Sequence, residues 1–261
     1  IALSLFVFLS EIIGPWRKKQ AILRKDVIKD LFYLFFNFFI FSLIIFEGLS
    51  NVGVNLFNDF IGLFGIENIW AINLQSLPIV IRFTILFLVA DFIQWNVHRL
   101  LHTSPILWEF HKVHHSVKEM GFAAHFRFHW METIVYKSIQ FVPLTMLGYN
   151  LEDLFLVHII TIAIGHLNHA NINVDYGILK YIINNPRMHI WHHSKALPKE
   201  HQNGMNFGIS LSLWDYIFKT AYIPKNGAEI ELGFDEDEHF PEALHKQMIY
   251  PLSHHKRTTE D

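Results

Sequence analysis

The chain has 261 residues and a formal net charge of −3, and 51% of its residues are hydrophobic whereas only 17% are charged. This composition is too apolar for an ordinary soluble domain, and it offers no basic surface for nucleic acid. The chain contains no cysteine. Disulfides and thiolate metal sites are therefore excluded, and any metal must be bound through nitrogen and oxygen atoms.

The first apolar segment covers residues 1–14 and ends before Pro15. It starts at Ile1 with no basic segment before it, so we interpret it as part of a membrane helix rather than as a signal peptide. Residues 16–30 carry six Lys and Arg side chains, and the positive-inside rule places such a loop in the cytoplasm. A second, Phe-rich span is predicted over residues 31–49.

A third span is predicted over residues 77–97, and it contains Arg82 and Asp91. Ionisable side chains inside a span are costly, so we expect both to face the protein interior or water. Residues 133–147 and 151–165 are apolar but too short for a comfortable crossing. They predict a helical hairpin that enters the bilayer and returns.

Counting crossings from the basic loop leaves residues 98–130 and 166–222, which are too polar to span, on the same cytoplasmic side. The sequence therefore predicts an all-α, polytopic membrane protein. We expect N-terminal spans and a connection in residues 1–76, a catalytic region in 77–222 and a polar, peripheral tail in 223–261.

Three histidine clusters carry the chemistry. On a helix, residues three and four apart share one face, so each cluster directs its imidazoles the same way. One metal ion such as zinc takes three or four protein ligands, so eight are too many for one ion and suit two. Imidazole binds iron, zinc, copper and nickel, which leaves the metal open. The eight candidate metal ligands and catalytic residues are His98, His102, His111, His114, His115, His189, His192 and His193.

Two simpler interpretations stand beside this one. An isolated His-x-x-x-His pair is more often a solvated helix face than a metal site. The whole set could also belong to a membrane protein that binds or transports metal without catalysis. That alternative would place ionisable groups along a path across the bilayer, whereas these histidines mainly flank the spans on one side.

The order of motifs resembles that of the fatty acid hydroxylase and sterol desaturase superfamily. The resemblance covers about Asp91 to Thr220, with Trp130 and Lys219 standing where the family usually has proline and glycine. The motifs are Asp91-Phe92, His98-Arg99-x-x-His102, Trp108-Glu109-Phe110-His111-x-x-His114-His115-Ser116, Arg127-Phe128-His129-x-x-Glu132, His169-Ala170-Asn171, Asn185-Pro186-Arg187-Met188-His189-x-x-His192-His193-Ser194, Asn206-Phe207-Gly208 and Leu213-Trp214-Asp215-x-x-Phe218-x-Thr220.

The resemblance implies a helical membrane protein with a cytosolic site for two iron ions. It also implies His169 as a ninth ligand and His129, in a shared motif, as a weaker candidate. His166 is a further weak candidate because it lies three residues before His169, on the same face if the helix continues. Members of this family hydroxylate or desaturate lipids with dioxygen and external electrons. No fused haem-binding module is evident, so we expect a separate electron donor, a cytochrome or ferredoxin with its reductase. The lipid itself stays open.

Carboxylates are expected to support the ligands. Asp91 lies two helical turns before His98 and therefore shares its face, so it is a candidate acceptor for His98 or His102. Glu109 is a second candidate in this supporting, cofactor-binding role, and Glu132 and Asp215 are others. For each of them, a simple ion pair or a polar residue lining a wet cavity is about as good an interpretation.

Overall fold

The computed structural model describes residues 2–37, 39–41, 59–60, 62–65, 74–146 and 151–252. Within these ranges every regular element is a helix, and the three β-bridges are isolated, as the all-α prediction requires. The α-helices are α1 (Ala2–Ile13), α2 (Val27–Phe35), α4 (Ile79–Thr103), α5 (Pro105–His115), α6 (Trp130–Met146), α7 (Leu151–His169), α8 (Pro186–His192), α9 (Leu213–Ile217) and α10 (Leu244–Met248). Short 3-10 helices are η2 (Leu74–Ser76), η3 (Phe122–Phe126), η4 (Gly177–Tyr181), η5 (Lys199–His201) and η6 (Asp237–His239).

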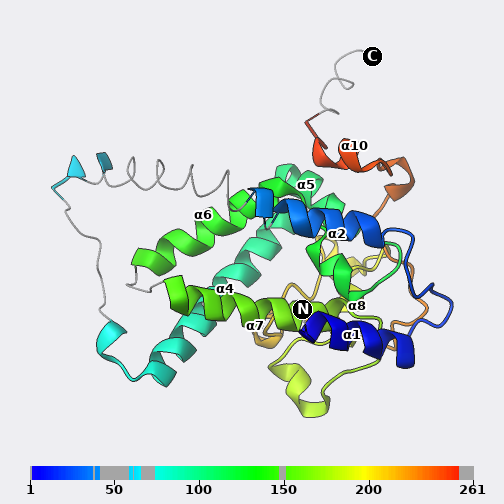
Figure 1. Ribbon diagram of the computed structural model, residues 1–261, viewed down its shortest axis with the longest axis horizontal. Helices are drawn as coiled ribbons and strands as arrows, with labels where there is room; N and C mark the ends of the chain where they lie inside the picture. The colour runs from blue at the N-terminus through cyan, green and yellow to red at the C-terminus, as the bar shows by residue number, and fades with distance from the viewer. Residues whose placement is uncertain are drawn as a thin grey trace.

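The central element is α4, which crosses the molecule diagonally in Figure 1. Among the described residues it is the one helix long and apolar enough to cross a bilayer. It continues beyond the predicted span through His98 and His102, in agreement with the helical spacing used for the first histidine cluster. Pro105 then stops it, because the residue before a proline avoids helical geometry and Ser104 is extended, with ψ at 118°.

Helices α6 and α7 cover the two segments for which a hairpin was predicted, and both pack against α4 (Figure 1). Both helices are longer than expected, since α6 begins at Trp130 and α7 ends at His169. The shared core includes Leu86 and Ala90 of α4 and Val157 of α7. The turn at 148–150 lies outside the described residues, as does most of the span predicted over 31–49.

Arg82, inside α4, forms an ion pair with Asp153 of α7 at 3.2 Å. Both side chains are mostly buried, at 15% and 7% exposed. The prediction that Arg82 faces the protein interior is therefore confirmed. A buried pair of this kind satisfies two charges that would otherwise be costly in an apolar setting.

The N-terminal basic loop is tied to the segment that follows the second histidine cluster. Asp30, which is fully buried, accepts hydrogen bonds from Arg24 at 2.5 Å and from Arg127 at 2.6 Å. Arg24 also donates to the carbonyl of Glu119 at 2.7 Å. The loop and the histidine region thus lie on the same side of the molecule.

The C-terminal segment is not peripheral, and that expectation is wrong for the described residues up to 252. Leu232, Phe234, Phe240 and Tyr250 are buried. They pack against α2 and α5 or against the residues around the histidine clusters. Single apolar side chains, separated by polar residues, provide this packing. The sequence was interpreted as peripheral because acidic residues dominate the segment around residues 235–238.

Candidate metal centre

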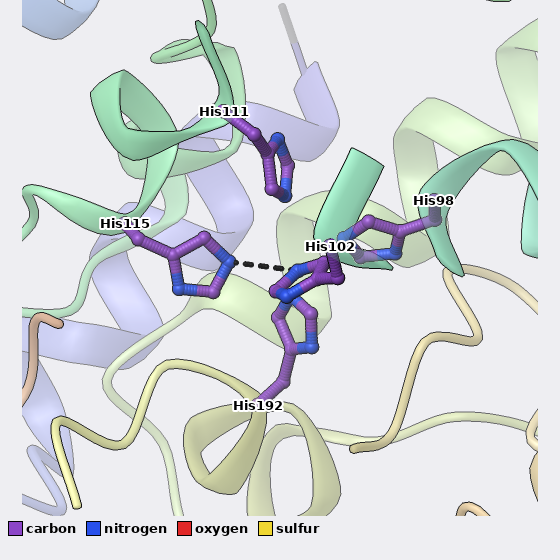
Figure 2. Close-up of side chains that lie close together, drawn as sticks. All are labelled: His98, His102, His111, His115 and His192. Carbon is purple, nitrogen blue, oxygen red and sulfur yellow. Dashed lines mark hydrogen bonds between the residues drawn. The ribbon is translucent and has the colours of Figure 1, made fainter. Parts of the chain in front are cut away.

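The candidate ligands form two adjacent groups. One ring nitrogen of each residue in a group lies within 4.8 Å of the others. The rings of the larger group point toward one another from three separate helices (Figure 2). The five-histidine group is His98, His102, His111, His115 and His192, and the four-histidine group is His114, His169, His189 and His193. All nine histidines of the predicted ligand set are therefore brought together.

Each His-x-x-His-His motif is divided between the two groups. In α5, His111 and His115 join the five-histidine group and His114 joins the other. In α8 and the residue after it the division is reversed, because His189 and His193 join the four-histidine group. Residues four apart nearly align on a helix, whereas a residue three along is displaced by roughly 60° around the axis. One motif can therefore bridge two neighbouring ions.

The local sequence explains why α8 begins at Pro186, just before the histidines of the third cluster. Pro186 occupies the first helical turn, and the side chain of Asn185 accepts a hydrogen bond from the amide of Met188 at 3.0 Å. Proline and an N-terminal cap of this kind define a helix start. His189 therefore falls in the first turn of a short, fixed helix.

Hydrogen bonds fix the orientation of five rings. A carbonyl or carboxylate oxygen only accepts, so each of these Nδ1 atoms carries a proton and leaves Nε2 as the ligand atom. This arrangement is typical of imidazoles that bind metal. The Nδ1–H groups of His98, His114, His169 and His192 donate to the carbonyls of Phe207 (2.7 Å), Arg127 (2.8 Å), Gly165 (2.8 Å) and Met205 (2.8 Å), and that of His111 donates to Glu132 (2.7 Å).

The nitrogens inside the groups fit a cation. His111 Nε2 and His192 Nε2 are buried and have no hydrogen-bond partner. In the four-histidine group, His169 Nε2 lies 2.9 Å from His189 Nε2 and 3.4 Å from His114 Nε2. Two nitrogen lone pairs at such distances need a proton or a metal ion between them. A set of only imidazoles suits a first-row transition metal.

Burial keeps these rings neutral. Loss of hydration, followed by the neighbouring histidines, lowers the pKa of His111, His115 and His193 well below the ordinary value. Burial lowers the pKa of His114 to about 4. Metal ligands must be unprotonated. The protein therefore holds its imidazoles in the binding form at neutral pH.

The carboxylates do not all act as expected. Glu132 holds His111, but Asp91 accepts a hydrogen bond from Trp214 Nε1 at 2.8 Å and supports neither His98 nor His102. Glu109 also contacts no ligand, because its carboxylate pairs with Lys112 and accepts from the Tyr250 hydroxyl at 2.8 Å. Asp91 is buried on the same helix as His98, but Trp214 of α9 donates a hydrogen bond to its carboxylate.

Asp215 supports the histidines indirectly, through the backbone of Phe207. It accepts hydrogen bonds from the amide of Phe207 at 2.9 Å, from Gly208 at 2.8 Å and from Trp95 Nε1 at 2.9 Å. Phe207 in turn offers its carbonyl to His98. Nearby, Lys219 has a φ of 60°, which explains why glycine is usual there in the family that the motifs resemble.

The two weaker candidates lie outside both groups. Both ring nitrogens of His129 contact backbone: Nε2 donates to the carbonyl of Met248 at 2.9 Å and Nδ1 accepts from the amide of Met131 at 3.1 Å. His166 Nδ1 lies 3.1 Å from His125 Nδ1. Neither residue belongs to either group, so we leave both off the proposed ligand set.

Two cavities reach the histidines and share no lining residue among those described. The small cavity, of about 270 Å³, extends between α4, α6 and α7. The large cavity, of about 730 Å³, lies at the turn between α4 and α5 and the loop after α8. The small cavity contacts His98, His111, His114, His169 and His189, and the large one contacts His102, His115 and His192.

Residues 231–240, which we call the C-terminal strap, contact the segments that follow the second and third histidine clusters. The amide of Gly233 donates to the carbonyl of His193 at 3.0 Å, and that of Lys195 donates to Glu231 at 2.9 Å. The Asp237 carboxylate pairs with Lys195 at 2.9 Å and with Lys118. These lysines follow the third and second histidine clusters by two and three residues. The sequence signal for the strap is weak: a lysine follows each of two histidine clusters, and the acidic residues 235–238 could pair with these lysines.

Comparison with known proteins agrees with the motifs. The sequence model of the family described as fatty acid hydroxylase matches residues 83–220, which contain all nine histidines. Ornithine lipid hydroxylase OlsE of Rhizobium tropici is 32% identical over 156 residues, which are 60% of this chain and 46% of that protein.

Two more distant relatives have other activities in their names. Very-long-chain aldehyde decarbonylase GL1-10 of Oryza sativa subsp. japonica is 26% identical over 51% of this chain and 44% of its own. Human alkylglycerol monooxygenase is 25% identical over 67% and 34%. The chain thus spans less than half the length of each relative. No solved structure matches.

Proposed function

This chain belongs to the fatty acid hydroxylase family, and on that premise we propose that it is a membrane-bound di-iron oxygenase that hydroxylates or desaturates a lipid. Two adjacent histidine groups opening onto one cavity carry this proposal. His115 and His193, from different groups, have ring centroids only 4.6 Å apart. Such proximity lets two ions act on one molecule.

The proposed ligands are the nine histidines of the two groups. When bound, two iron ions would supply the redox chemistry that breaks an unactivated C–H bond with dioxygen. The chain supplies the positioning: Glu132 and the backbone carbonyls hold the rings, and the small cavity presents the lipid and keeps bulk water away. We propose that electrons come from a separate cytochrome or ferredoxin.

The names of the relatives support a lipid substrate. They include a hydroxylase of ornithine lipid and a monooxygenase of alkylglycerol. Those names fit hydroxylation better than desaturation. Because this chain covers less than half of each relative, we propose only the lipid class here.

We propose that the protein is an integral membrane protein with its site on the cytoplasmic face. Helix α4 is long enough to cross a bilayer, and α1 and residues 153–169 are shorter apolar helices. The basic loop supports the orientation, because Arg24 bonds to the carbonyl of Glu119, just after the second histidine cluster. The basic loop and the histidine groups therefore lie on the same side of the protein, which we propose is the cytoplasmic side.

Metal content and coupled oxygen consumption test the proposal. We expect the purified chain, loaded with Fe²⁺, to retain two iron ions and to consume dioxygen with reductant in step with oxidation of a lipid from a broad panel. His192→Ala should abolish this turnover, and His245→Ala, at an exposed position of α10, should leave it intact. If the loaded protein never oxidises any lipid in the panel, the proposal is wrong, and metal storage or transport replaces it.

A further inference from the structure

Three uncharged polar side chains line the small cavity close to the histidines. Gln94 belongs to α4, and Thr133 and Tyr136 lie three residues apart on one face of α6. The Thr133 hydroxyl is buried and has no hydrogen-bond partner. No other described residue hydrogen-bonds to the side chain of Gln94 or Tyr136. A polar group that is shielded from water without a partner is costly, so these three groups call for a ligand.

Two sets of contacts fix the register between α4 and α6. At the metal centre, both helices contact His111: its ring centroid lies 5.1 Å from that of His98, and its Nδ1–H donates to Glu132 at 2.7 Å. Eight residues before His98 and eight residues after Glu132, Gln140 donates to the carbonyl of Ala90 at 3.0 Å. The two helices therefore run antiparallel along this cavity.

The register places Gln94 and Tyr136 at one level. Gln94 precedes His98 by four residues, and Tyr136 follows Glu132 by four. Each side chain is thus one helical turn, about 6 Å, away from the metal centre. Thr133 lies between this level and the histidines. An amide, a phenol and a hydroxyl from two helices therefore face one part of the cavity.

The chemistry of these groups suits an uncharged lipid group. Hydroxyl and carboxamide side chains both donate and accept hydrogen bonds, so a hydroxyl or an amide of the ligand can satisfy them. A charged group would lose its hydration here and gain no opposite charge from them. Lys137 and His158 also line the cavity, but both already have partners of their own.

We propose that Gln94, Thr133 and Tyr136 bind an uncharged hydroxyl or amide of the lipid and so hold a carbon about 6 Å from that group beside the histidines. This proposal rests on the proposed function, because it names the substrate class of the same site. The substrate is then a neutral polar lipid that is oxidised close to its hydrogen-bonding group. A plain hydrocarbon chain has nothing to fix which carbon reaches the histidines.

Lipid binding to the iron-loaded chain in neutral detergent micelles tests this site without turnover. The probes are oleyl alcohol, oleamide, oleyl sulfate and octadecene, and the readout is the dissociation constant of each. We expect the alcohol or the amide to bind about ten times more tightly than octadecene and the sulfate, which is the effect of one hydrogen bond. The tighter of the two identifies a hydroxyl or an amide as the bound group. If neither binds more tightly than octadecene, or if the sulfate binds most tightly, the proposal is wrong.

Variants then locate the site. Tyr136→Phe removes a single oxygen and Gln94→Met keeps the length of the side chain, so both should retain their iron. Each should reduce the preference for the alcohol or the amide and leave the binding of octadecene unchanged. Tyr181→Phe, at an exposed tyrosine outside the small cavity, is the matched control and should keep the preference. A preference that persists undiminished in the double variant would contradict the assignment.

The two proposals fail separately. A preference for the neutral polar lipid without oxygen consumption would refute the oxygenase and keep the binding site. Turnover of lipids without that preference would keep the oxygenase and refute the binding site.

Discussion

The two histidine groups differ in more than their number of rings. The five-histidine group contacts both cavities, whereas the four-histidine group contacts only the small one among the described residues. Within the part of the chain that the structure describes, a carboxylate, Glu132, holds a ring of the five-histidine group and none holds a ring of the other. The strap instead holds the backbone of the four-histidine group at His193. Two sites built from the same motifs thus have different surroundings, and we expect different sensitivities.

The largest difference should follow from removing one ligand in each group. His193→Ala leaves three imidazoles in its group, and His115→Ala leaves four, enough for a complete tetrahedral set. We expect His193→Ala to lose one of two iron ions under a mild chelator and to lose at least about 100-fold in turnover, since even supporting residues cost 10–100-fold. His115→Ala should keep both ions. Elemental analysis after dialysis measures this, and equal iron loss in the two variants would refute the comparison.

Removing the carboxylate should affect only the five-histidine group. In Glu132→Gln the neutral amide still accepts from His111 but no longer raises its basicity, so iron affinity should fall by about 10–100-fold at one of the two ions. Competition with a chelator gives the two affinities. Glu109→Gln is the matched control, because that carboxylate contacts Tyr250 and Lys112 instead of a ring. An equal loss in the control would show that charge in general, and not contact with His111, matters.

The strap should matter chiefly for stability. The Asp237 side chain is only 3% exposed and pairs with Lys118 and Lys195, so Asp237→Asn should lower the free energy of unfolding by about 1–3 kcal/mol. Thermal unfolding in detergent measures the loss. The control is Asp235→Asn, at an exposed neighbour. If Asp237→Asn and Asp235→Asn unfold at the same temperature, the ion pairs of the strap do not stabilise the protein.

The sequence predicted which histidines the structure brings together, because the signal that selects them is local. Helical spacing alone collects His111, His114 and His115 on one face, and the motif order added His169. Helical spacing also separates the middle histidine of each motif from the two that are four apart. Which group each of them joins depends on how α5 and α8 face each other, and no local pattern contains that. The strap was missed for the same reason, because Asp237 meets Lys118 across more than a hundred residues. The apolar pattern predicted α4 up to residue 97, and the helical spacing of His98 and His102 predicted its continuation, which ends before Pro105.

A small pH effect should separate a structural histidine from the ligands. Burial lowers the pKa of His129 to about 4, below its ordinary value of about 6.5. Below pH 6.5 the unfolded chain therefore binds a proton that the folded chain rejects, so stability falls as the pH falls toward 4 and is level above 6.5. Between pH 6.5 and 5.5 this histidine should account for about 1 kcal/mol. His129 stands behind the five-histidine group, since its amide donates to Glu132, yet its two ring nitrogens hydrogen-bond to backbone atoms of Met248 and Met131. His129→Gln should thus flatten the pH dependence of unfolding without changing the iron content, whereas an unchanged slope would assign the whole acid sensitivity to the ligand histidines.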